Sequence, residues 1–100
     1  MSIIPEGSNI FIIDLEYIAP FEKIDPLIED HLKFLDKYYK LNVFIASGAK
    51  VPRNGGVILA VSETKSMIAD IIKENPFHAN NVANYSITEF HPSKASDKLR

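Results

Sequence analysis

His31 is the residue of this sequence best suited to acid–base chemistry. It belongs to an apolar stripe with helical spacing, formed by Ile24, Leu27, Ile28, His31, Leu35 and Tyr38. Because such a stripe faces the interior, we expect His31 to project from its helix toward a sheet. An imidazole there can accept or donate a proton near neutral pH. The position also suits a core histidine whose ring nitrogens are bonded by backbone or water, and spacing alone favours that second role.

A second polar group follows the end of a predicted strand. Ser47 and Gly48 close this strand, and Lys50 and Arg53 lie in the loop after it. A hydroxyl at a strand end can orient a ligand in a mouth formed with the neighbouring helix, although such a serine commonly stabilises a turn instead. Two cations at a pocket rim would suit an anionic ligand, which the guanidinium can bind in bidentate fashion. The alternative is a solvated hairpin.

The remaining polar residues indicate no metal or nucleotide site. Asp36 lies about 140° from His31 around a helix, so we expect it on the surface rather than paired with the imidazole. His78 and His91 are not spaced with His31 as a ligand set, and a metal needs three or more converging ligands. The Asn-Gly-Gly run at 54–56 has neither Walker nor Rossmann spacing. We therefore expect no metal and no cofactor.

Hydrophobic patterns arrange the chain as β-α-β-β-α-β. Strands are expected at 10–18, 42–48, 57–61 and 82–90, and helices at about 25–39 and 63–73. Asp25 and Ser62 are the expected helix caps. With right-handed crossovers, this order gives a four-stranded antiparallel sheet of order 4-1-3-2 with both helices on one face. The predicted fold class is α+β and ferredoxin-like.

One face of such a sheet has no helices, and here it is partly apolar. The even positions of the first strand mix isoleucines with Asp14 and Glu16. A partly apolar open face is an interface candidate, and symmetric pairs are the commonest assembly. We therefore predict a homodimer, the alternative being a monomer with a wet sheet face.

Length and composition limit the classes of function. The 100 residues predict a single domain with its core at about 10–91 and a polar, poorly ordered tail at 92–100. A net charge of −2 does not suggest a nucleic-acid partner, and the absence of cysteine suits a reducing compartment. No apolar run approaches the roughly 20 residues that span a bilayer, and the N-terminus lacks a basic signal-peptide region. We expect a cytoplasmic protein with neither membrane nor nucleic acid as partner.

Short motifs follow one another in a specific order over about residues 10–93. They are His31-Leu-Lys-Phe-Leu-Asp36, Tyr39, Ser47-Gly48, the run Val51 to Ile58, Asn75-Pro76-Phe77, Tyr85-Ser-Ile87 and Glu89-Phe90-His-Pro92. In this order the motifs resemble the YciI-related family of small proteins. The resemblance implies a dimeric α+β barrel, built from two ferredoxin-like sheets, and a pocket around His31. Most members have no assigned activity; a related member is a dehydrochlorinase of a chlorinated hydroxyquinol, in which a histidine and an acidic residue are implicated.

Two positions depart from the pattern of that family. Ala49 follows Gly48 where the family usually has proline, and Asn75 stands where it usually has aspartate before Pro-Phe. If the aspartate at this position is the partner of the histidine in catalytic relatives, Asn75 can replace its hydrogen bond but cannot accept or hold a proton as the aspartate would.

Two functions are consistent with these residues. The first is a small dimeric enzyme without cofactor that performs lyase- or isomerase-type proton transfer on a small anionic or aromatic metabolite. His31 would move the proton, Ser47 would orient the substrate, and Lys50 or Arg53 would hold its negative charge. The second is a ligand-binding or accessory dimer that uses the same pocket, including Asn75, without turnover. A third possible function is that of a purely structural interaction module, and only the open sheet face supports it.

Overall fold

A computed structural model describes residues 3–99; Met1, Ser2 and Arg100, which belong to the expected flexible lead-in and tail, lie outside the described residues. The strands are β1 (Asn9–Tyr17), β2 (Phe44–Ala49), β3 (Gly55–Ser62) and β4 (Ala83–Phe90). The helices are α1 (Phe21–Ile24), α2 (Ile28–Lys40), α3 (Lys65–Ile72) and α4 (Pro76–Ala79), with 3₁₀ turns η1 (Asp25–Leu27) and η2 (Asp97–Leu99).

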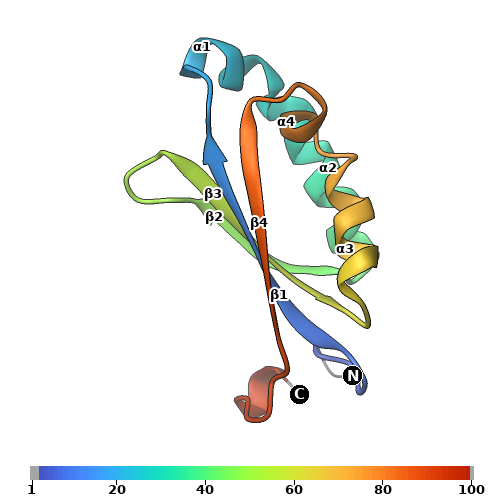
Figure 1. Cartoon of the computed structure of the whole chain (residues 1–100). Helices are drawn as coiled ribbons and strands as arrows, with labels where there is room; N and C mark the ends of the chain where they lie inside the picture. The colour runs from blue at the N-terminus through green and yellow to red at the C-terminus, as the bar shows by residue number, and fades with distance from the viewer. Residues whose placement is uncertain (1–2, 100) are drawn as a thin grey trace.

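The strands form one antiparallel sheet in the order β2-β3-β1-β4, which is the predicted order read from the other edge. Figure 1 shows α2 and α3 on the same face of this sheet. The predicted α+β class and ferredoxin-like topology are therefore confirmed. Among residues 3–99, no helix is long and apolar enough to cross a bilayer.

The core lies between this sheet face and the helices. Phe11, Ile13 and Leu15, at alternate positions of β1, are at most 2% exposed, as the two-residue period of a strand requires. Helix residues complete the cluster: Ile24, Phe34, Leu35, Tyr38, Ile68 and Ile72. Each large apolar side chain buried here contributes about 1.5–3 kcal/mol. This packing fixes which face of α2 is turned toward the sheet, and it thereby sets the direction of His31.

The helix boundaries differ from the sequence prediction. Instead of one helix from about residue 25, α1 and η1 precede α2, and Asp25 binds Arg53 rather than capping a helix. Pro26 has no N–H to give to the turn, which favours this break. In the second helix Thr64, not Ser62, is the cap, because its side chain accepts the N–H of Met67 while Ser62 still belongs to β3.

The C-terminal segment packs onto the sheet face that carries no helices. The N–H of Ile4 donates to the carbonyl of Leu99 at 3.1 Å, and Leu99 packs against the cluster of Ile4, Ile10 and Val61. The sequence predicts a polar, poorly ordered tail at 92–100, and in the structure these contacts of Leu99 connect the described part of that segment to the fold. The two ends of the described part of the chain therefore lie at the same end of the sheet, as Figure 1 shows.

Candidate functional site

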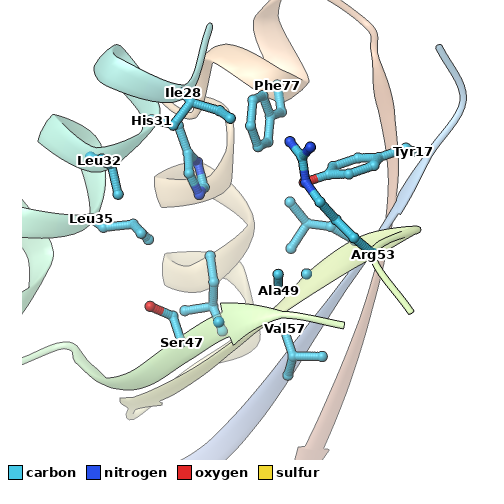
Figure 2. A pocket seen from close by; sticks show the side chains of 14 residues that line it. Tyr17, Ile28, His31, Leu32, Leu35, Ser47, Ala49, Arg53, Val57 and Phe77 are labelled. Atoms are coloured by element: carbon cyan, nitrogen blue, oxygen red, sulfur yellow. The ribbon is translucent and has the colours of Figure 1, made fainter. Parts of the chain in front are cut away.

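A cavity of about 260 Å³ lies between α2 and the hairpin of β2 and β3, as Figure 2 shows. Apolar side chains form most of its wall, among them Leu15, Ile28, Leu35 and Phe77. Its polar side chains are those of Tyr17, His31, Ser47 and Arg53. Ligand pockets commonly have volumes of roughly 300–1,000 Å³, so this cavity suits a small metabolite rather than a large cofactor.

His31 enters the cavity from α2 and is held on two sides. Its ring stacks on the ring of buried Phe77, with centroids 4.3 Å apart and planes 15° from parallel. Its Nδ1 lies 3.0 Å from Oδ1 of Asn75, which is fully buried at the start of α4. The stack and the hydrogen bond together restrict rotation of the imidazole.

The hydrogen bonds of Asn75 assign the proton on the imidazole. Oδ1 of Asn75 also accepts the backbone N–H of Phe77, at 3.1 Å. A backbone N–H can only donate, so the shared atom must be the amide oxygen, and Nδ1 of His31 must donate to it. The neutral ring then carries its proton on Nδ1. Among residues 3–99, Nε2 of His31 has no hydrogen-bond partner, which leaves its lone pair to an occupant of the cavity.

The surroundings of His31 also favour the neutral ring. Burial lowers its pKa below the ordinary value of 6.5, and the hydrogen bond to Asn75 opposes this only in part. The amide of Asn75 brings no negative charge that would stabilise an imidazolium. At neutral pH the cavity therefore contains an uncharged proton acceptor.

Arg53 supplies positive charge at another side of the cavity. Its Nη2 donates to Oδ1 of Asp25 at 2.7 Å. Its Cζ lies 4.5 Å from the ring centroid of Phe21 and 5.8 Å from that of Tyr17. The hydrogen bond to Asp25 raises the pKa of Arg53 further above its ordinary range, so the guanidinium stays charged. Figure 2 shows its side chain extending from the hairpin toward Phe77 and Tyr17.

Comparison with models of protein families identifies the family of this chain. The family model described as the YCII-related domain matches residues 10–91. The chain belongs to the YCII-related family. The resemblance seen in the sequence motifs is thereby confirmed. Curated proteins and solved structures give no significant match.

Ser47 and Lys50 of this YCII-related protein face opposite sides of the sheet. Ser47 lines the cavity, and its Oγ lies 2.7 Å from the hydroxyl of Tyr39. Lys50 is not among the lining residues; its Nζ donates to Oδ1 of Asp14 at 2.6 Å, on the face without helices. Successive strand residues point to opposite faces, so Lys50, directly after cavity-lining Ala49, turns away. The structure therefore brings together His31, Ser47, Arg53 and Asn75, without Lys50.

Sequence reasoning missed two partners of the YCII-related site. Phe77 was noted only as part of a motif, although its position two residues after Asn75 allows the amide to cap α4 beneath the imidazole. The sequence predicts Asp25 as a helix cap, whereas in the structure its carboxylate is the hydrogen-bond partner of Arg53. Asp36 is exposed, as expected. Among residues 3–99, no three acidic or histidine side chains are grouped so that they could hold a metal ion.

Proposed function

We propose that this protein binds a small anionic molecule with an apolar or aromatic body and transfers a proton to or from it with His31, without a cofactor. The observation that carries the proposal is the hydrogen bond between Nδ1 of His31 and Oδ1 of Asn75. With this bond in place, the neutral imidazole can offer Nε2 to the cavity as a general base.

The proposed reaction is of the lyase or isomerase type. Nε2 of His31 takes a proton from the substrate, and the electron pair left behind either expels a leaving group or shifts the position of a double bond. In the lyase case the imidazolium then gives the proton to the leaving group or to water. In the isomerase case it returns the proton to another atom of the substrate. The guanidinium of Arg53 would stabilise the negative charge that develops, and Ser47 would orient the substrate by a hydrogen bond. Because Asn75 is neutral, only an already acidic proton would be removed at a useful rate.

A second candidate function is binding without turnover. Asn75 favours it, because an amide cannot stabilise the imidazolium as a carboxylate would. The Nδ2 of Asn75 is also a buried N–H donor that has no partner among residues 3–99. In this case Nε2 would accept a hydrogen bond from the ligand and no proton would move.

The proposal includes a homodimer and a cytoplasmic location, with neither nucleic acid nor membrane as partner. The dimer contact would use the sheet face without helices. Ile12 and Leu59 are half-buried at the centre of this face, and Phe90 on β4 is 42% exposed. The association of two such sheets is also the assembly that the family resemblance implies.

A ligand screen by thermal unfolding tests the proposal. Small carboxylates with apolar bodies should raise the Tm of the wild type and of Lys50→Ala, the control outside the cavity, but not that of His31→Ala or Arg53→Gln. Turnover of a bound compound, lost in His31→Ala with the fold intact, supports the enzyme, and stable binding without turnover supports the second candidate. If His31→Ala lowers stability and leaves binding unchanged, His31 is a core residue and the proposal fails.

A further inference from the structure

Arg53 occupies the boundary between the His31 cavity and a second hollow. The outer hollow, of about 410 Å³, is lined by Tyr17, Phe21 and Asn54, among other residues. Arg53 lines both spaces. An anion in the cavity and an anion on the outer side can therefore compete for the same guanidinium.

In the structure the anion on Arg53 is the chain's own carboxylate. Asp25, in the turn η1 directly before α2, accepts from Nη2 at 2.7 Å. Both side chains are partly exposed, 38% for Arg53 and 55% for Asp25. Ion pairs exposed to this degree are weak, so this one can be exchanged for a better partner.

Arg53 has other contacts besides the ion pair with Asp25. The guanidinium lies 4.5 Å over the ring of Phe21, and Tyr17 is its second aromatic neighbour. Such stacking holds an arginine in place without using its N–H donors. Loss of the Asp25 carboxylate would therefore leave the guanidinium near the cavity with a free donor.

We propose that Asp25 is an internal competitor that sets the affinity of the His31 cavity for carboxylate ligands. In the empty protein Asp25 occupies Arg53, and a ligand carboxylate inside the cavity replaces it. Displacement of Asp25 reduces the net binding free energy of any anion that binds Arg53. Only an anion that also fills the apolar cavity gains enough binding free energy to offset this loss. Small inorganic anions are therefore bound less well than carboxylates with an apolar body. This inference rests on the proposed function, because it requires an anionic ligand beside His31.

The test uses benzoate as the anionic probe and benzamide as its uncharged counterpart, titrated into the full chain and followed by NMR. Asp25→Asn should tighten benzoate binding about two- to fivefold, the factor that corresponds to an exposed ion pair. Binding of benzamide should not change. In an Arg53→Gln background, Asp25→Asn should give no gain. Glu22→Gln, which removes one nearby acidic charge that is not paired with Arg53, should leave the affinity for benzoate close to that of the wild type.

Each contrary outcome has a distinct meaning. If Asp25→Asn binds benzoate equally or more weakly, Asp25 does not compete for Arg53 and the inference is wrong. If its gain persists in the Arg53→Gln background, or Glu22→Gln gives the same gain, the effect is general electrostatics and the inference is again wrong. If benzoate still shifts the NMR signals of His31 in these cases, the proposed function stands and only the role of Asp25 is lost. If neither probe shifts those signals in any variant, the proposed function and this inference fail together.

Discussion

Asn75→Asp is expected to convert the neutral hydrogen bond to His31 into an ion pair. In the wild type, Oδ1 of Asn75 accepts N–H groups from His31 and Phe77, at 3.0 and 3.1 Å. A carboxylate of the same shape can accept both, and its charge favours the imidazolium. The pKa of His31, which burial now holds below 6.5, should therefore rise.

The size of the rise follows from the contact geometry. Opposite charges about 4 Å apart attract by about 4 kcal/mol at an effective dielectric constant near 20, which corresponds to at most about three pKa units. Burial of the carboxylate opposes this gain, because Asn75 is 0% exposed. We expect a net increase in the pKa of His31 of about one to two units.

The assay is an NMR titration of the His31 ring protons against pH, in wild type and variant. Asn80→Asp is the matched control: it makes the same change of charge at the end of α4, where the side chain bonds to the carbonyl of Pro76 instead of to His31. Asn80→Asp should move the pKa of His31 much less. Where a substrate is known, Asn75→Asp should also increase turnover, because the imidazolium formed by proton abstraction gains a counter-charge.

A folded Asn75→Asp variant in which the pKa of His31 is unchanged or lower would be the opposite result. In that case Asn75 is not the partner of Nδ1, and the assigned proton position is wrong.

Three further changes test the fold and the assembly. The pKa of His31 in the folded protein is below the ordinary value of 6.5, so near this pH the unfolded chain binds more protons than the folded one. The free energy of unfolding should therefore fall as the pH drops below 6.5. This fall should be smaller in His31→Phe. Gly55→Ala puts a Cβ 1.8 Å from the carbonyl oxygen of Leu15 and should destabilise the protein by about 3 kcal/mol or more in urea unfolding, whereas Gly48→Ala meets open space. Leu59→Lys should convert the proposed dimer to monomer in sedimentation velocity.

The sequence predicted the strands and the inward direction of His31, because these depend on hydrophobic periods within single elements. The strand order followed from the order of the elements along the chain and from the right-handed crossover rule. The sequence predicted Lys50 in a loop at the rim of the cavity, whereas the structure turns Lys50 toward Asp14, because one residue at the end of β2 decides on which side of the sheet a side chain lies. The contact between His31 and Asn75 joins residues 44 positions apart and depends on how α4 begins. The contact between Arg53 and Asp25 spans 28 positions and forms only when the hairpin meets η1. Spacing carries no information on such contacts until the fold is known.

The most direct test of the central claim is the tautomer of His31, read from a long-range ¹H–¹⁵N correlation spectrum of the labelled ring at neutral pH. We expect a proton on Nδ1, an unprotonated Nε2, and a change at Nε2 when a carboxylate ligand enters the cavity. A ring that carries its proton on Nε2, or that is doubly protonated at neutral pH, would contradict the central claim.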